Sequence, residues 1–284
     1  MFPKKRIILT GATGFIGKNL ARVLNDYNYS LVIISRNAEK AKSVISFGEI
    51  FINWNDIFKP GSITQLENVE SIIHLAGENI FARRWNEKHK KRIYESRIDS
   101  TKIIVELISK LKKKPESFIC ASATGYYGFS SDNEIFTLTS PPGNDFLAKV
   151  VTDWEKASAE ADSYGIRRVN MRTGIVLDKS GGILRKLTPV FKLYMGAIIG
   201  SGRQWLPIIS LDDLVKLYLN TLEDKSISGP INAVSKSITM KEFCKNLGKN
   251  LNRPVLFRIP EFMLKIVLGE GARYILKGTR TEPL

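Results

Sequence analysis

Cysteine and histidine are scarce in this chain of 284 residues, and their scarcity removes several kinds of site. Its two cysteines, Cys120 and Cys244, are too few for a disulfide framework, and we expect both to be reduced. The two histidines, His74 and His89, have no cysteine and no cluster of acidic residues beside them, so no metal site is predicted. We expect His74 to form hydrogen bonds at the end of a strand instead.

Long apolar runs are also missing, and none approaches the roughly twenty residues that a membrane-spanning helix needs. The first apolar strand begins within about six residues of the start, which leaves no room for a signal peptide. The sequence has no nucleophile elbow, no P-loop lysine and no deaminase signature. We therefore expect a cytoplasmic protein without a membrane partner and outside those three enzyme classes.

Acidic residues are fewer than basic ones, and the formal net charge is +15. The densest basic segments, Lys88–Arg92 and Lys110–Lys114, bracket one expected helix whose apolar stripe runs from Ile93 to Leu111. No aromatic residues alternate with the basic ones, and no nucleic-acid motif is present. The charge therefore predicts no specific nucleic-acid binding, and we expect part of it to attract an anionic cofactor or substrate.

The most informative segment present is Arg6–Gly17, in which a short apolar strand runs into three glycines spaced G-x-x-G-x-x-G and then into an amphipathic helix. Gly11 permits a tight turn, Gly14 lets the backbone approach a pyrophosphate, and Gly17 lets the helix pack closely on the strand. The helix N-terminus offers N–H groups to the phosphates. This order predicts dinucleotide binding through Gly11, Thr13, Gly14, Phe15, Ile16 and Gly17.

The end of the next expected strand, 31–36, indicates which dinucleotide is bound. An NAD-selecting fold places an acidic residue there, about twenty residues after the last glycine, to bind the ribose 2′-hydroxyl. This chain has Ser35 and Arg36 instead, and no carboxylate follows until Glu39. A 2′-phosphate would meet a cation and a hydroxyl group, so the sequence predicts NADP(H).

Strand and helix signals alternate along the first 172 residues. Further strands are expected at 49–54, 70–75, 117–122 and 168–172, with helices between them. This alternation predicts an α/β fold, a Rossmann-type doubly wound parallel sheet with a smaller C-terminal substrate-side lobe. The ligand crevice of such a sheet lies at the carboxyl ends of its strands, where Gly11, Arg36, Gly77 and Ser122 fall.

The pattern changes after Arg172, where glycines become frequent and helices are expected near 211–223 and 239–251. No repeat, low-complexity tract or flexible linker separates the two parts. We therefore divide the chain into an NADP-binding core, 1–172, and a segment, 173–284, that partly returns to the core and forms the substrate-side lobe. The sequence is compatible with a homodimer.

Several motifs together resemble an extended short-chain dehydrogenase/reductase: the glycine loop, His74–Gly77, Ser122–Gly128 and Gly229–Asn232. More narrowly, the chain resembles the atypical "epimerase family" proteins, which are described as nucleoside-diphosphate-sugar epimerases. The segments that carry this narrower resemblance are Gly77–Ile80 with Arg84-Trp85, Ser96-Arg97, Phe146–Ala148 with Trp154-Glu155, and Gly200–Gln204. It covers residues 6–283 and implies cofactor contacts at Leu75, Ala76 and Gly77; members of that family usually continue with a short aromatic-rich tail.

The resemblance also exposes a departure. Ordinary members of the superfamily use a tyrosine and, four residues later on the same helix face, a lysine that lowers the pKa of the tyrosine. Alignment places Phe146 and Val150 at these positions, and neither can move a proton. Lys149 is one position away, which turns its side chain about 100 degrees from that face. The stripe Phe146, Val150, Trp154, Ala157 and Ala161 predicts packing against the sheet.

Other residues could supply the chemistry. Ser122 and Thr124 lie where the superfamily's hydroxyl residue polarises a carbonyl, and the loop spacing does not choose between them. Tyr126 and Tyr127 follow, but a phenol with a pKa near about 10 needs a cationic neighbour to act as a base. Glu78 is a carboxylate that we expect near the nicotinamide. The candidate catalytic residues are Ser122, Thr124, Tyr126, Tyr127 and Glu78.

Two functions follow from these observations. The first is an NADP(H)-dependent oxidoreductase or sugar-nucleotide epimerase with a non-standard active site, acting on a small carbonyl compound or nucleotide sugar held by the loop at 200–210. The second is a non-catalytic NADP(H)-binding regulatory or scaffold protein, which the loss of both tyrosine and lysine favours. The polar residues at the end of the fifth strand, and Arg203 with Gln204, favour the enzyme.

Overall fold

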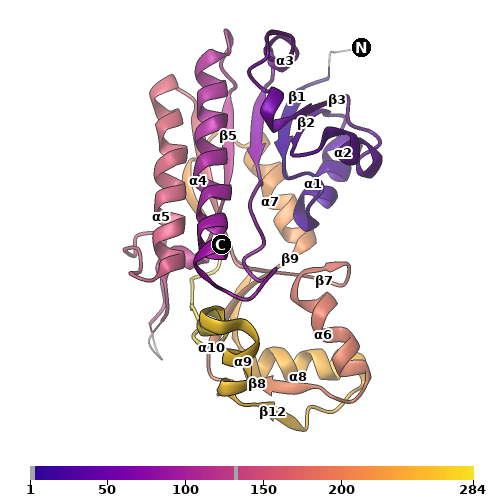
Figure 1. The fold of residues 1–284 in the computed structure, drawn as a ribbon, viewed down its shortest axis with the longest axis vertical. Coiled ribbons are helices and arrows are strands. Elements are labelled where there is room, and N and C mark those ends of the chain that lie inside the picture. The colour runs from indigo at the N-terminus through magenta and orange to yellow at the C-terminus, as the bar shows by residue number, and fades with distance from the viewer. Residues whose placement is uncertain (1–3, 131–133) are drawn as a thin grey trace.

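The computed structural model describes residues 4–130 and 134–284, and its centre is a sheet of seven parallel strands (Figure 1). The strand order is β10-β6-β5-β4-β1-β2-β3. Their bounds are β1 Arg6–Thr10, β2 Ser30–Ser35, β3 Ile50–Asn53, β4 Ser71–His74, β5 Ser117–Ala123, β6 Arg167–Thr173 and β10 Gly229–Ala233. The predicted Rossmann-type doubly wound fold is confirmed.

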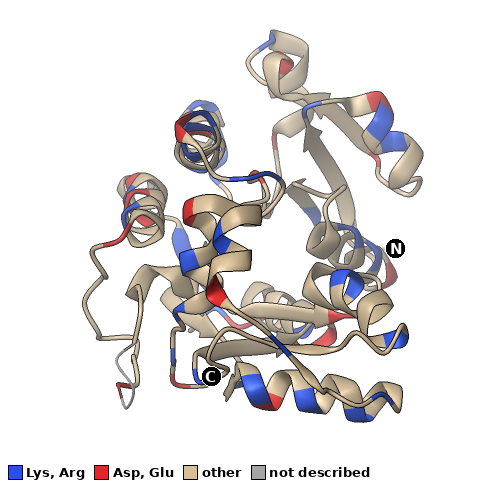
Figure 2. Cartoon of the chain, turned by 60° about the horizontal axis from the view of Figure 1, so that its bottom comes forward, with Lys and Arg blue, Asp and Glu red and all other residues tan. Residues whose placement is uncertain are grey.

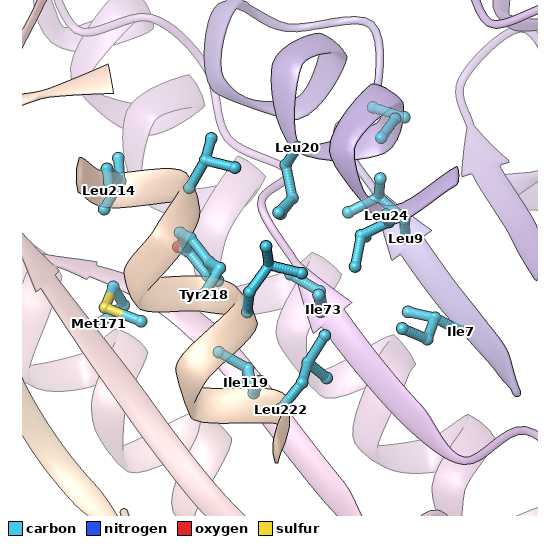
Figure 3. Packing of buried hydrophobic residues seen from close by; sticks show 14 of the residues in the cluster. Ile7, Leu9, Leu20, Leu24, Ile73, Ile119, Met171, Leu214, Tyr218 and Leu222 are labelled. Carbon is cyan, nitrogen blue, oxygen red and sulfur yellow. The ribbon is translucent and has the colours of Figure 1, made fainter. Parts of the chain in front are cut away.

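One face of the sheet is covered by α1 (Phe15–Asp26), α2 (Ala38–Val44) and α7 (Leu211–Glu223). Figure 3 shows how α7 directs Leu214, Tyr218 and Leu222 at the strands, beside Leu20 and Leu24 of α1. These side chains are nine-tenths or more buried, and α7 lies against α1 as well as the sheet. Burial on both faces is the reason why the central strands are continuous apolar runs.

The opposite face packs against α3 (Pro60–Leu66), α4 (Glu87–Lys110) and α5 (Phe146–Ala159). The predicted stripe is confirmed, because Val150, Trp154 and Ala157 of α5, and Ala161 just beyond it, are buried in this second core and Phe146 packs against it. The indole N–H of Trp154 donates to Thr101 Oγ1 on α4 at 2.9 Å, which joins the two long helices. Lys149 lies off the stripe and pairs with Asp153 at the surface.

A small lobe covers the carboxyl ends of the strands, and it has its own core. It contains a sheet in the order β11-β9-β7, a two-stranded parallel sheet of β12 and β8, and the helices packed on them. Its elements are β7 Ile175–Asp178, α6 Gly182–Lys192, β8 Ala197–Ile199, β9 Trp205–Ser210, β11 Lys236–Thr239, α8 Met240–Leu251, β12 Phe257–Ile259, α9 Glu261–Leu268 and α10 Arg273–Leu276. Between β9 and β11 the chain returns to the large sheet as α7 and β10.

Residues 278–284 connect the two parts of the molecule. Ser130 N–H donates to the carbonyl of Gly278, and Phe136 N–H donates to that of Arg280. On the other side, Thr281 exchanges hydrogen bonds with the Ser237 hydroxyl of β11. We call this segment the C-terminal strap, because it bonds both to the loop after β5 and to the small lobe.

Charge is distributed over the whole structure. Lys and Arg residues lie on helices of both the large sheet and the small lobe (Figure 2). Within the described residues no group of three or more His, Cys, Asp and Glu side chains could hold a metal ion. No helix in the same part of the chain is long and apolar enough to cross a membrane. Both cysteines are free and buried.

Candidate functional site

The glycine loop has the geometry that phosphate binding requires. Gly11 has a φ of +68°, and a Cβ at this position would lie 2.8 Å from the Leu75 carbonyl group. A Cβ on Gly17 would lie 2.2 Å from the Gly11 oxygen, so the first turn of α1 packs closely against the glycine loop. Gly14 is exposed, and no described side chain caps the N-terminus of α1. The first N–H groups of this helix can therefore bind an anion.

A buried hydrogen-bond chain fixes the segment that faces this loop. Thr10 Oγ1 accepts from the N–H groups of Leu75 and Ala76 at 3.2 Å each and lies 2.7 Å from His74 Nδ1. The hydroxyl therefore donates to Nδ1, and Nε2 donates to Ser100 Oγ at 3.1 Å. Burial lowers the pKa of His74 to about 3, which keeps the ring neutral. The expected hydrogen bonding of His74 is confirmed.

Ser35 and Arg36 lie at the carboxyl end of β2, next to β1 and its glycine loop. The Arg36 side chain is 87% exposed, and its Nη1 lies 3.9 Å from Glu78 Oε2. The Glu78 N–H donates to Ser96 Oγ on α4. Glu78 thus lies near the carboxyl end of β2, and its place near the nicotinamide stays a prediction. Arg36 reaches across the carboxyl end of β1 to the loop after β4.

Arg97 is a residue that the search for catalytic groups missed. Its Cζ would lie 3.4 Å from a Cβ on Gly77, and it stacks 5.2 Å from the Trp154 ring centroid. Burial lowers the pKa of Arg97 to about 10, which leaves the guanidinium protonated at neutral pH. Within the described residues it forms no ion pair. The Ser96-Arg97 pair in the family resemblance was the signal that could have identified it.

A polar network closes the carboxyl ends of β5 and β6. Arg172 donates from Nε and Nη2 to the two oxygens of Glu155 at 2.9 and 2.8 Å, and Ser122 Oγ donates to Glu155 at 2.6 Å. Arg172 Nη1 also donates to the Tyr127 hydroxyl at 3.0 Å, which in turn donates to Asn232 Oδ1 at 2.7 Å. Burial opposes the charge of Arg172, but the hydrogen bonds to Glu155 and Tyr127 raise the pKa of the guanidinium above its ordinary value.

Two hydroxyl groups in this region are left outside the network. They belong to Thr124 and Tyr126, both in the short 3₁₀ helix η2 (Thr124–Tyr127). Neither hydroxyl bonds to another group in the described part of the chain. Tyr126 is half-buried, and the Arg172 Cζ lies 3.5 Å from the centroid of its ring. The structure thus gathers Ser122, Thr124, Tyr126 and Tyr127 at the carboxyl end of β5, whereas Glu78 lies in the loop after β4.

The side of α5 that faces η2 is apolar. The Leu147 Cβ and the Val151 Cγ2 lie 3.8 and 3.9 Å from the place that a Cβ on Gly125 would occupy. The aligned pair, Phe146 and Val150, lies one residue earlier and packs into the second core. No residue of either pair can exchange a proton, so the absence of a tyrosine–lysine pair at these positions of the helix holds for either alignment.

A cavity of about 660 Å³ lies between the N-terminus of α5 and the end of the small lobe. Three rings line it, with Trp85 centred 5.6 Å from Phe146 and 4.9 Å from Tyr274. The other lining residues come from α9, α10 and the 3₁₀ helix η4 (Gly269–Ala272) between them, and from Lys277 just beyond α10. We call this space the aromatic cavity.

Arg203 and Gln204, which favoured an enzyme in the sequence, have different surroundings. Gln204 is buried, and its amide N–H₂ group donates to the carbonyls of Ile199 and Ile275. It therefore joins β8 to α10 inside the small lobe. Arg203 is exposed at the surface.

Comparisons with known proteins agree with this geometry. A family model described as the NAD dependent epimerase/dehydratase family matches residues 7–233. An epimerase family protein SDR39U1 homolog, chloroplastic, from Arabidopsis thaliana is 36% identical over 284 residues, covering 98% of this chain and 80% of the relative. Epimerase family protein YfhF from Bacillus subtilis is 35% identical, covering 98% and 90%. A crystal structure of human epimerase family protein SDR39U1 (isoform2) with NADPH superimposes with a TM-score of 0.87 at 30% identity, covering 98% and 91%.

Proposed function

The chain belongs to the NAD-dependent epimerase/dehydratase family, and from this premise we propose that it is an NADP(H)-dependent enzyme in which Tyr126 exchanges the proton. The reaction is oxidoreduction of a small carbonyl or alcohol substrate, or epimerisation of a nucleotide-linked sugar by oxidation and reduction of one carbon. Two buried free cysteines suit a reducing compartment, and we place the protein in the cytoplasm.

The residues around the crevice fit NADP(H), the cofactor found with the human relative. The glycine loop and the N-terminus of α1 would hold the pyrophosphate, and Ser35 with Arg36 would hold the 2′-phosphate. Leu75, Ala76 and Gly77 would line the cofactor from the loop after β4, with Arg97 as an additional cation. Bound NADP(H) supplies or accepts a hydride at C4 of its nicotinamide.

The observation that carries the catalytic proposal is the state of the hydroxyl groups near the end of β5. Ser122 already donates to Glu155, and Tyr127 is 2% exposed with its hydroxyl bonded on both sides. The hydroxyl groups of Thr124, which is 7% exposed, and of the half-buried Tyr126 form no hydrogen bond within the described residues. This distinction supports Thr124 over Ser122 as the donor that polarises a substrate carbonyl.

Tyr126 has the cationic neighbour that a phenol needs. When a carbonyl carbon receives a hydride, its oxygen takes the phenolic proton, and the resulting phenolate lies against the Arg172 guanidinium. In the opposite direction the phenolate accepts the proton of the substrate hydroxyl. Two hydrogen bonds to Glu155 fix the Arg172 guanidinium beside the Tyr126 ring, so the cation is already in position before the reaction.

The test compares two neighbouring tyrosines. A panel of aldehydes, ketones, quinones and nucleotide sugars is screened for NADPH oxidation, and the substrate that reacts is then used with Tyr126→Phe and Tyr127→Phe. We expect Tyr126→Phe to lower kcat by about 10² to 10⁴ without changing NADPH affinity. Tyr127→Phe is expected to lower thermal stability instead. Unchanged kcat in Tyr126→Phe contradicts the assignment.

A second candidate, a non-catalytic NADP(H)-binding regulatory or scaffold protein, is favoured by the apolar face of α5. Leu147 and Val151 occupy the side of the helix nearest η2, where a proton-transferring pair would have to stand. For such a protein, no compound in the panel is turned over, and Tyr126→Phe changes nothing beyond stability.

A further inference from the structure

We propose that the aromatic cavity is the substrate pocket and that its ligand is a planar ring compound carrying a carboxylate or phosphate group. The choice of pocket rests on the proposed function, whereas the class of ligand rests on the cavity alone. A volume of about 660 Å³ is in the range of small-molecule sites.

The walls of the cavity favour a flat apolar body. Trp85 and Tyr274 lie at 30° to each other, and Phe146 meets Trp85 edge-on at 80°. These rings are anchored: the Trp85 indole N–H donates to the Ile80 carbonyl at 2.7 Å, and the Tyr274 hydroxyl accepts from the Leu147 N–H at 3.4 Å. Rigid aromatic walls bind a second ring by stacking and edge contacts at little entropic cost.

The rim of the cavity favours an anion. Lys265, Arg273 and Lys277 line it, and none of them forms an ion pair within the described residues. Of the two carboxylates on the rim, Glu270 is already neutralised by Lys90 at 2.8 Å, which leaves Glu261. Arg273 and Lys277 both lie over the ring of Phe129, at 5.0 and 5.5 Å from its centroid. Positive charge therefore exceeds negative charge on this rim.

The cavity adjoins the proposed catalytic groups. Tyr274 packs against Phe129, which lies three residues after Tyr126 and just beyond η2, with ring centroids 5.3 Å apart. Its hydroxyl bonds to Leu147, which packs over Gly125 in η2. Tyr274 in the cavity wall therefore touches the chain after Tyr126 directly and the chain before it through Leu147.

Binding of inert probes tests this inference without cofactor or turnover. The probes are 2-naphthoate, its uncharged analogue 2-naphthamide, and inorganic phosphate, each titrated by calorimetry. We expect 2-naphthoate to bind at least about tenfold more tightly than 2-naphthamide, because a charge-assisted hydrogen bond contributes this much. Phosphate alone is expected to bind more weakly than 2-naphthoate, because it does not use the rings.

Three variants locate the site. Arg273→Gln and Lys277→Gln should reduce the preference for 2-naphthoate over 2-naphthamide about fivefold or more, and Phe146→Ala should weaken both probes. Lys245→Gln, an exposed lysine on α8, is the matched control and should change neither. Equal binding of the two naphthalene probes overturns the proposal. It is also overturned if Lys245→Gln reduces the preference for 2-naphthoate as much as Arg273→Gln and Lys277→Gln do.

The outcome is independent of the catalytic assignment. If 2-naphthoate binds as expected but no carbonyl compound is reduced, the proposed function fails and the ligand class stands. If a substrate is turned over while the rim variants leave 2-naphthoate binding intact, the ligand class fails and the enzyme stands.

Discussion

Glu155 and Arg172 face each other as a two-point ion pair, with side chains only 13% and 4% exposed. The pair lies under the ring of Tyr126 and bonds to both Ser122 and Tyr127. Its two halves come from α5 and β6, so it ties a covering helix to the sheet beside the crevice.

Removing the carboxylate from this pair should be strongly destabilising. Glu155→Leu leaves the guanidinium buried without its partner, and we expect the free energy of unfolding to fall by about 3 to 5 kcal/mol. Urea unfolding followed by circular dichroism measures the change. Lys149→Gln, which breaks an exposed pair on the same helix, should leave the urea midpoint nearly unchanged. A similar loss in both variants would contradict the special role of the buried pair.

Cofactor choice should depend on Arg36. We expect NADPH to bind more than about tenfold more tightly than NADH, because one charge-assisted contact to the 2′-phosphate contributes about 1.5 to 3 kcal/mol. Arg36→Asp should reverse the preference, since a carboxylate repels the phosphate and accepts from a 2′-hydroxyl. Nicotinamide fluorescence titrations measure both affinities. Equal affinities in the unmodified protein would show that Arg36 does not select the cofactor.

Glu78 should have the opposite effect to Arg36 on NADPH binding, because it weakens the hold on the 2′-phosphate. Its carboxylate lies 3.9 Å from the Arg36 guanidinium and competes with a 2′-phosphate for it. We therefore expect Glu78→Gln to tighten NADPH binding severalfold while changing NADH binding little, which is an effect of about 1 kcal/mol or less at this exposed site. The titrations used for Arg36→Asp serve here too. Loss of turnover with unchanged cofactor affinity would instead make Glu78 a catalytic residue.

His74 should make stability depend on pH. Its pKa is about 3 in the folded protein and about 6.5 in the unfolded chain, so only the unfolded chain takes up the proton between these values. The contribution to stability is complete above pH 6.5 and is lost as the pH falls, by about 1.4 kcal/mol per unit. Urea unfolding at pH 7, 6 and 5 should show this slope.

The control for this pH dependence is His74→Gln, which keeps a polar side chain but cannot be protonated. It should unfold more readily at pH 7, yet its stability should change less between pH 6.5 and 5. An identical slope in the variant and the unmodified protein would assign the dependence to other groups.

Local pattern was sufficient to predict six of the seven strands of the large sheet, all except β10. The strand expected at 31–36 is Ser30–Ser35, and the helix expected at 211–223 is Leu211–Glu223. Such agreement arises because strands buried on both faces are long apolar runs, and helices that cover them are amphipathic. In the small lobe the strands β8 and β12 have three residues each, which is too short for a periodic signal.

The candidate site depended on contacts between distant residues, and the sequence left these open. Nothing near Ser122 or Thr124 indicates which hydroxyl is free; the answer comes from Glu155, which lies 33 positions away from Ser122. The position of Glu78 depends on the adjacency of strands and on the reach of Arg36. Arg97 lies on a helix surface that the pattern assigns to solvent, but Gly77 and Trp154 cover it.

The C-terminal strap has a consequence for the order in which the molecule is built. Residues 278–284 follow, in the chain, both the loop after β5 and the strand β11 to which they bond. The ribosome makes both of those partners before residues 278–284, so the strap can join the loop after β5 to the small lobe only after both have been synthesised. The strap joins segments that lie about 150 positions apart in the chain. Long-range contacts of this kind form slowly. Until the strap bonds, the hydrogen bonds that it makes to the loop after β5 and to β11 are missing.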